Sequence, residues 1–175
     1  MEPPELLRRL RRLAAKRGLE QLGLTPEDIE EELGMRYAYP YELLPQPEGG
    51  FTITFPGVPE AITQGESAEE AAAMAEDALV TALSFYTDSG VRLPHPSPAH
   101  GRPLAYVPPL VAAKLALHDA MLAAGVSNVA LARQLGTDEK TVRRLRDPLY
   151  QSRINQVDAA LRVLGKRMGI VIEAA

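Results

Sequence analysis

A group of basic and hydroxyl side chains near residue 140 has the chemistry to contact nucleic acid. Val142 and Leu145 are spaced like the buried side of a short helix, so the polar residues around them fall on or beside its outward face. Such a face could enter a major groove, where Lys and Arg reach phosphates and base edges. The alternative is a solvated basic face without a ligand. The candidate contacts here are Lys140, Thr141, Arg143 and Arg144.

Three further candidate DNA contacts precede this helix. Ser127 and Asn128 would begin the preceding helix, where free backbone N–H groups can hold a phosphate. Thr137 lies in the turn between the two helices. Asp138 and Glu139 would repel phosphate, so they either cap the second helix or help to select bases.

The elements that would position these residues have the pattern of a helix-turn-helix. Ala132, Gly136 and Val142 supply a small residue where the helices cross, a glycine in the turn and an apolar anchor in the second helix. A helix over residues 110–124 precedes the pair, and a last helix, capped by Ser152, follows it.

Residues 169–172 form a short β-prone tail with no local strand to pair with. The tail could join the sheet of a neighbouring molecule or add an edge strand, so we expect a homodimer or a higher homo-oligomer. A two-fold dimer would present two recognition helices to a palindromic DNA site.

The middle of the chain predicts a small antiparallel sheet with one covering helix. Apolar residues alternate with threonine over 51–55, the period of a strand with one buried face. Ser67, with Glu70 three residues later, forms a capping box that begins an amphipathic helix ending near Gly90. The fold class is therefore α+β, joined to an all-α helix-turn-helix domain. The expected strands are residues 37–44, which form a hairpin with the next strand, then 51–55, 61–63 and a short addition at 104–107.

No set of residues predicts catalysis, a metal or a cofactor. The chain has no cysteine, and no second ligand type recurs at metal spacing near His95, His100 or His118. The expected strands offer no inward pair of carboxylates, and no nucleophile has a suitable base. We therefore expect a protein that is not an enzyme.

Two stretches resemble a known family. The run Gly-Gly-Phe-x-Ile-x-Phe-Pro-Gly-x-Pro-Glu-Ala at 49–61, with Ser-x-Glu-Glu-Ala at 67–71, resembles the N-terminal domain of HicB-family antitoxins. Residues 127–145 resemble the Cro/repressor-type helix-turn-helix found in some HicB proteins. The resemblance covers about residues 35–170 and implies a partial ribonuclease-H-like sheet. We divide the chain into a toxin-binding domain at 35–98, a linker at 99–109 that its proline content indicates, and a helix-turn-helix domain at 110–175.

The resemblance implies an antitoxin. Its N-terminal domain would bind and occlude a HicA-type ribonuclease toxin, and its C-terminal domain would bind operator DNA and repress the operon. The alternative is a stand-alone transcriptional regulator whose α+β domain dimerises or senses a ligand. A toxin-like reading frame immediately upstream would favour the antitoxin. The expected toxin contacts are Phe51, Phe55, Glu60, Glu66 and Glu69.

Residues 1–34 precede this family-like part and predict two short helices. Residues 6–20 resemble the first helix of HicA-type toxins and residues 21–28 their C-terminal helix, but the sheet between them is missing. We hypothesise a toxin remnant fused ahead of the antitoxin; the alternative is a helical extension specific to this family. No histidine precedes His95, so the segment cannot carry out histidine-based RNA cleavage.

Charge is divided sharply along the chain. Residues 1–19 hold six Lys and Arg against two Glu, residues 20–90 hold fifteen Asp and Glu against one Arg, and residues 91–175 hold twelve basic against six acidic residues. This division favours an acidic module that meets a cationic protein and a basic module that meets phosphate. No apolar run approaches the roughly 18 residues of a membrane-spanning helix. Together with the absence of cysteine, this predicts a cytoplasmic protein that does not bind membranes.

Overall fold

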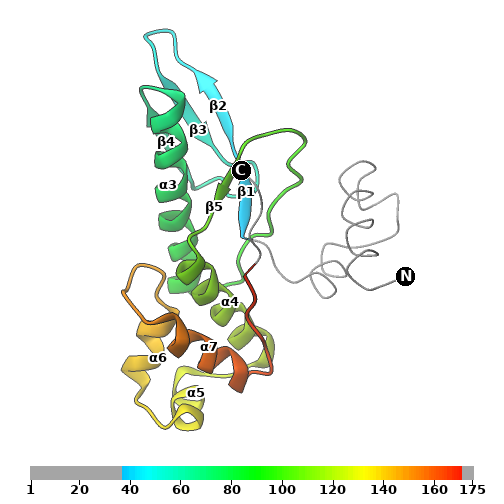
Figure 1. Cartoon of the computed structure of the whole chain (residues 1–175), viewed down its shortest axis with the longest axis vertical. Coiled ribbons are helices and arrows are strands. Elements are labelled where there is room, and N and C mark those ends of the chain that lie inside the picture. Colours follow the sequence, from blue (N-terminus) through cyan, green and yellow to red (C-terminus); the bar gives the residue numbers. More distant parts are fainter. Residues whose placement is uncertain (1–36, 171–175) are drawn as a thin grey trace, which may run out of the picture.

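The computed structural model describes residues 37–170, in which a long helix and small sheets lie above a group of shorter helices (Figure 1). The α+β class predicted from the sequence is confirmed. The expectations for residues 1–34 lie outside the described residues. The elements in chain order are β1 (Ala38–Pro40), β2 (Glu42–Pro45), β3 (Phe51–Thr54), β4 (Ile62–Gly65), α3 (Ala68–Ser89), β5 (Leu104–Tyr106), α4 (Pro109–Ala124), α5 (Asn128–Leu135), α6 (Glu139–Arg146) and α7 (Ile154–Val163).

Three of the strands form one antiparallel sheet in the order β2-β3-β4. Leu43 pairs with Ile53, and Ile53 pairs with Thr63 on the other side. The predicted hairpin between the first strand and the central strand is confirmed as β2–β3. Because Ile53 is fully buried, this row of side chains faces the core, while the neighbouring rows face outward.

The strand expected over residues 37–44 is divided into two. β1 pairs with β5 instead of continuing the three-stranded sheet, so that Tyr39 lies opposite Ala105. Between the two ladders, the N–H of Tyr41 donates to the carbonyl of Pro103 at 3.0 Å. Pro40 accounts for the break, since proline has no N–H with which to continue a ladder. The predicted short strand in the proline-rich segment is confirmed as β5.

Helix α3 begins as the sequence predicts. The N–H of Glu70 donates to the Ser67 hydroxyl at 3.2 Å, and the Glu70 carboxylate accepts a hydrogen bond from the N–H of Glu66 at 2.9 Å. The return bond of the capping box therefore reaches one residue further back than expected. Gly90, at φ +66°, ends the helix in the left-handed conformation.

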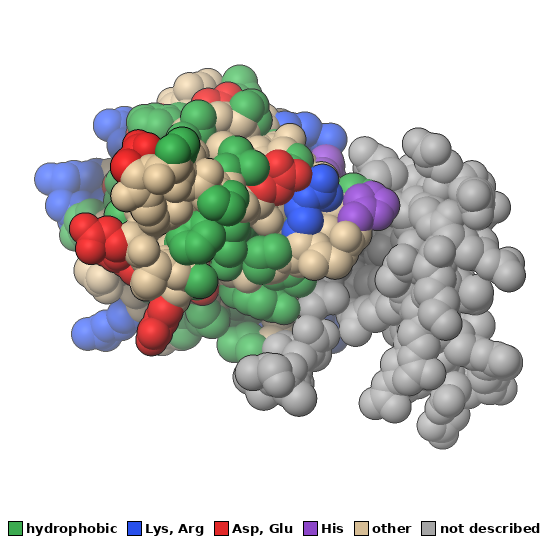
Figure 2. Space-filling model, turned by 90° about the horizontal axis from the view of Figure 1, so that it is seen from above, with side chains coloured by type: hydrophobic (Ala, Val, Ile, Leu, Met, Phe, Trp, Pro, Cys, Tyr) green, Lys and Arg blue, Asp and Glu red, His purple; other side chains and the backbone are tan. Residues whose placement is uncertain are grey.

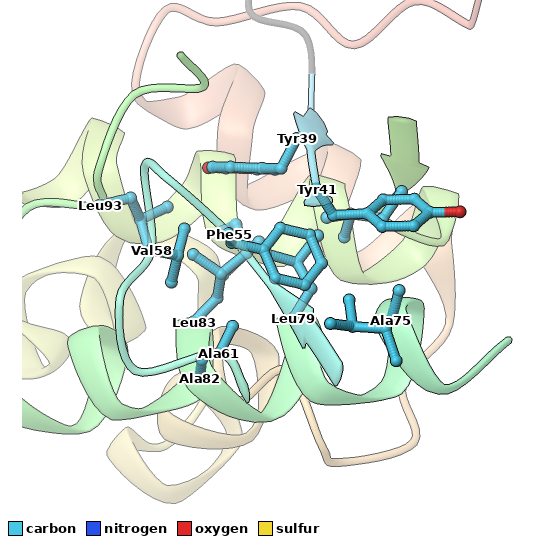
Figure 3. Close-up of a cluster of buried hydrophobic side chains, with 14 of the residues drawn as sticks. Tyr39, Tyr41, Phe55, Val58, Ala61, Ala75, Leu79, Ala82, Leu83 and Leu93 are labelled. Carbon is cyan, nitrogen blue, oxygen red and sulfur yellow. The ribbon is translucent and has the colours of Figure 1, made fainter. Parts of the chain in front are cut away.

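The first core lies between α3 and the strands (Figure 3). The rings of Tyr41 and Phe55 are 5.8 Å apart between centroids and lie above Leu79 and Leu83 of α3. Contiguous burial of this kind is the main stabilising contribution to a small α+β unit. The remaining core residues include Tyr39, Ile53, Val58, Ala61, Ala71, Ala75, Ala82 and Leu93.

The proline-rich segment at 99–109 takes part in this core. Ala105 and Val107 are buried in it, on and next to β5. Arg102 binds Glu42 of β2 through its Nε at 2.8 Å. The segment expected to be a linker therefore contributes one strand and two core residues to the sheet part.

Helix α4 contributes to both parts. Its Leu115 lies in the first core, whereas Leu117 and Met121 lie in a second core formed with α5, α6 and α7. The sheet part and the helical part therefore share one continuous helix, α4. The second core consists of Ala113, Leu117, Ala120, Met121, Leu131, Ala132, Val142, Leu145, Val157, Ala160 and Leu161.

Two apolar residues of the helical part are exposed, and the cap predicted at Ser152 is not formed. Val129 is 52% exposed, because it lies about 200° around α5 from the buried Leu131. Ile154 is 37% exposed, because it begins α7 one turn before Val157, the first buried position of that helix. Ser152 does not cap α7, since its hydroxyl accepts a hydrogen bond from a buried ammonium group instead.

The predicted β tail is described only in part. Residues 169–170 are not in a strand, and the rest of the tail lies outside the described residues.

Candidate nucleic-acid interface and acidic surface

Helices α5 and α6 are joined by a short turn that a glycine makes possible. Gly136 has φ +64°, and the N–H of Thr137 donates to the carbonyl of Ala132 at 2.9 Å. Val142 and Leu145 of α6 are buried, as the sequence predicts. This fixes which side of α6 faces solvent.

The outward side of α6 is basic. Lys140, Arg143 and Arg144 are all exposed. Arg143 pairs with Glu139 one turn earlier at 2.7 Å, and the Arg144 guanidinium lies 5.0 Å from the centroid of the Tyr150 ring. An exposed ion pair of this kind contributes only about 0.3–0.5 kcal/mol, so Arg143 can exchange it for a phosphate.

Asp138 caps α6. Its Oδ1 accepts the N–H of Thr141 at 2.7 Å. This bond, followed by one to the Thr141 side chain and the charges of Arg144 and Lys140, lowers the pKa of Asp138. Of the two roles that the sequence leaves open, the structure provides the cap for Asp138, while Glu139 is occupied by Arg143.

The two predicted contacts at the N-terminus of α5, Ser127 and Asn128, make different hydrogen bonds. The Ser127 hydroxyl caps the helix, accepting the N–H of Ala130 at 3.2 Å. The Oδ1 of Asn128 accepts a hydrogen bond from Nη1 of Arg146 at 2.8 Å. Of the seven predicted DNA contacts, Asn128 and Thr141 are half-buried, and the exposed ones are Ser127, Thr137, Lys140, Arg143 and Arg144.

A buried histidine that the sequence did not single out links the helices behind this surface. His118 of α4 is fully buried, with Nε2 at 2.7 Å from the carbonyl of Val91 and Nδ1 at 2.9 Å from Nη2 of Arg146. A guanidinium only donates, so Nδ1 accepts and Nε2 carries the proton that it donates to Val91. The ring is therefore neutral. Its position among apolar residues of α4 gave no sign of this role.

The stability of the protein should depend on the neutral form of His118. Burial, together with the charge of Arg146, lowers the pKa of His118, although the bond to Val91 and the charge of Asp119 oppose the shift. The unfolded chain therefore binds a proton at a higher pH than the folded chain does. The neutral ring contributes stability above the pKa of histidine in the unfolded chain, about 6.5. This stability is lost as the pH falls below that value.

We expect urea unfolding to show this loss between about pH 7.5 and pH 5.5. In His118→Gln, which cannot be protonated, the free energy of unfolding should vary less with pH over the same range. His95 and His100, which remain in both proteins, provide the internal control. Parallel pH profiles for the two proteins would contradict the prediction.

The exposed face of α3 is acidic. The helix carries five Asp and Glu residues and no Lys or Arg. Figure 2, which views the end of the molecule that carries the β2–β3 turn, shows acidic side chains beside hydrophobic ones, with Lys and Arg mostly at the margin. The acidic residues of α3 are Glu69, Glu70, Glu76, Asp77 and Asp88, and all are exposed.

The predicted toxin contacts do not all reach this surface. Phe55 is 2% exposed and packs in the first core, and Phe51 is half-buried. Glu60 is exposed and accepts the Tyr86 hydroxyl at 2.8 Å. Glu66 and Glu69 are exposed beside the start of α3. The alternation that predicts the strand already places Phe55 on the same side as Ile53, which is the buried side.

Residues 37–170 provide neither a cluster of metal ligands nor a single helix that could span a membrane. This part of the chain holds no group of three or more His, Cys, Asp or Glu residues that could bind a metal ion. None of its helices is by itself long and apolar enough to span a membrane; α4 and α5 reach the required length and composition only together, and they meet at 108°.

Comparison with known proteins decides the family. Residues 38–116 match the model of the HicB-like antitoxin of bacterial toxin–antitoxin systems. Antitoxin HicB of Escherichia coli K12 is 38% identical over 135 residues, which are 77% of this chain and 98% of that protein. The chain belongs to the HicB antitoxin family. Antitoxin HicB 2 of Photorhabdus laumondii is 40% identical over 78% of this chain and 96% of its own length, and Antitoxin HicB of Pseudomonas fluorescens is 37% identical over 79% and 96%.

The HicB family match spans the structure from β1 into α4. It includes the proline-rich segment and ends at Ala116, immediately after Leu115, the residue of α4 that lies in the first core. The matched stretch of this HicB protein is thus the sheet, α3 and the part of α4 that packs on them.

Proposed function

We propose that this HicB protein is a non-catalytic cytoplasmic antitoxin. It binds and occludes a HicA-type ribonuclease toxin through its α+β part, and it represses its own operon by binding promoter DNA through α5 and α6. The observation that carries the proposal is the opposite charge of two exposed helix faces. α3 has five acidic and no basic residues, whereas α6 has Lys140, Arg143 and Arg144 facing solvent.

The DNA-binding half of the proposal is supported by the construction of α6. Its apolar side is anchored by Val142 and Leu145, and its N-terminus is capped by Asp138, so its basic side is held outward. Basic side chains on one helix face supply both phosphate contacts and base readout in a major groove. A homodimer would present two such helices to a palindromic operator.

The toxin-binding half is supported by the acidic surface around the start of α3. Glu66 and Glu69 are exposed there, and Glu60 lies exposed where the chain approaches β4. A cationic partner would be steered to such a surface, and rim charges of this kind mainly determine the association rate. We retain these three carboxylates as toxin contacts, with Phe51 at their margin and without the buried Phe55.

Reversing two of these charges should weaken binding to the toxin. In Glu66→Lys/Glu69→Lys, we expect the affinity for the HicA-type toxin encoded beside the gene to fall roughly 10- to 100-fold, mainly through slower association. The effect should diminish as salt is added, because exposed charges are screened. Surface plasmon resonance at several salt concentrations measures both effects.

The control places the same change of charge on the helical part. Glu139→Lys/Asp158→Lys should bind the toxin like the wild type. An equal loss of toxin affinity in both double variants would show that the total charge of the protein, and not the acidic surface, determines binding. If the wild type binds promoter DNA but neither binds the toxin nor relieves its growth arrest, the antitoxin role fails and a stand-alone regulator remains.

A further inference from the structure

A fully buried lysine lies directly behind the segment that follows α6. Lys114 of α4 has an exposed fraction of 0%, and its Nζ is surrounded by four oxygen atoms. An ammonium group has three N–H donors, so it is fully hydrogen-bonded there. The acceptors are the carbonyls of Arg144 at 3.0 Å, Asp147 at 2.8 Å and Tyr150 at 2.6 Å, and the hydroxyl of Ser152 at 2.9 Å.

None of these four acceptors is a carboxylate, so the lysine is not neutralised by an ion pair. Burial lowers the pKa of Lys114, and the only opposing contribution comes from the charge of Asp147. A methionine or leucine would fill the same space without the cost of desolvating a charge. What the ammonium adds is convergence. Two carbonyls and a hydroxyl of the irregular segment that follows α6 meet at one point, together with the carbonyl of Arg144 near the end of that helix.

The segment held in this way, residues 147–152, presents an aromatic ring beside the basic face of α6. Tyr150 is 41% exposed, and its ring lies 5.0 Å from the Arg144 guanidinium and 5.8 Å from Nζ of Lys114. Leu149, next to it, is 62% exposed. The Asp147 carboxylate is turned into the segment, where it accepts the N–H of Leu149 at 2.9 Å.

We propose that residues 147–152 form a second DNA-contacting element, in which Tyr150 packs against the sugar–phosphate backbone next to Arg144, and that Lys114 is the positioning residue that holds this element in place. The proposal rests on the DNA binding proposed above. The charge around the segment favours nucleic acid over a protein partner, because its exposed charged neighbours Arg143, Arg144 and Arg153 are all cationic. Stacking on Tyr150 also restricts the Arg144 side chain, so less freedom is lost when it meets a phosphate.

The test measures binding of the full-length protein to a duplex covering its own promoter, at several salt concentrations. Tyr150→Ala should weaken binding about five- to tenfold, because one contact is lost and Arg144 is released. Tyr150→Phe keeps the ring and should bind within about twofold of the wild type. Lys114→Met should weaken binding about tenfold at a temperature where the protein stays folded, and amide exchange should quicken in residues 147–152.

A purely structural lysine would behave differently. Lys114→Met would then lower the melting temperature but leave the DNA affinity of the folded protein unchanged, and that result would overturn the proposal. If Lys114→Met does not fold, Ser152→Ala, which removes one of the four acceptors, should show a smaller loss of DNA affinity. If the two single variants Ser152→Ala and Tyr150→Ala both bind DNA like the wild type, the proposal is also overturned.

Failure of the inference and failure of the proposed function are distinguishable. If the wild type binds the promoter and Lys140→Ala/Arg143→Ala weakens that binding, while Tyr150→Ala and Lys114→Met do not, then only the second contact element is wrong. If the wild type does not bind the promoter at all, the DNA-binding function is wrong, and the inference that depends on it is overturned as well.

Discussion

Lys140→Ala/Arg143→Ala is expected to weaken binding to promoter DNA roughly 100-fold near physiological salt. Both side chains are exposed on the face of α6 that points away from Val142 and Leu145. A lost phosphate contact lowers the salt dependence of binding by about one unit of slope, whereas a lost bidentate base contact costs about 1–3 kcal/mol at one position. The salt dependence therefore separates the two roles.

Fluorescence anisotropy with a labelled promoter duplex, repeated over a range of salt concentrations, gives both quantities. We expect the slope of log K against log salt to become shallower by about two if both residues contact phosphate. If Arg143 reads a base instead, the slope should change by about one and sequence preference should relax. Arg143 leaves only an exposed pair with Glu139, so breaking that pair opposes binding weakly.

A matched control removes two positive charges from another helix. Arg162→Ala/Arg167→Ala has the same net charge as the test variant, but the two residues lie on and just after α7. Binding close to that of the wild type is expected from this control. If both double variants lose affinity equally, the protein is attracted to DNA by its overall charge, and α6 is not a recognition helix.

The helices were predictable because their ends are specified locally. Ser67 and Ser127 accept the N–H three residues later, and Gly90, Gly125 and Gly136 adopt the left-handed conformation at the helix ends. Each signal involves residues within one turn, so it can be recognised without the tertiary structure. The outward position of Lys140 and its neighbours follows in the same way from the spacing of two apolar residues.

The strand pairing was harder to predict because it depends on distant residues. The hairpin β2–β3 follows from a short turn, but β1 pairs with β5, more than 60 residues further along the chain. Pro40 indicates an edge or a strand start within residues 37–44, but the local pattern does not show which strand each half of the segment pairs with. The proline content of residues 99–109 indicated a linker, although Ala105 and Val107 are core residues.

The buried polar groups were not predictable for a related reason. Lys114 and His118 of α4 are fully buried, although charged and polar residues are usually exposed. Their partners come from other elements: the acceptors of Lys114 lie 30 to 38 residues away, and His118 contacts a residue 28 positions away. Burial of such groups is tolerated only because those partners converge in the folded protein. A sequence read one element at a time does not contain that convergence.

Gly65→Ala is expected to lower the free energy of unfolding by about 1–3 kcal/mol, although in most strands and helices alanine is more stabilising than glycine. A Cβ at residue 65 would lie 2.7 Å from the backbone N and 2.8 Å from the Cα of Ala71 in the first turn of α3. Because these are backbone atoms, no change of rotamer relieves the overlap. β4 must move away from α3, which disturbs the hydrogen bond between Glu66 and Glu70.

Urea unfolding followed by circular dichroism measures this loss, and Gly169→Ala is the matched control. A methyl group at residue 169 would have no neighbouring atom within 4 Å, and the backbone there is not left-handed, so alanine should change stability by no more than about 0.5 kcal/mol. The damage from Gly65→Ala should also be confined to one part of the protein. Glu66 and Glu69 adjoin the displaced strand, so toxin binding should weaken, whereas the second core contains no residue of β4 or α3, and DNA binding should persist. A Gly65→Ala protein as stable as Gly169→Ala would mean that β4 can withdraw from α3 without cost, and that their close approach does not hold the acidic surface in place.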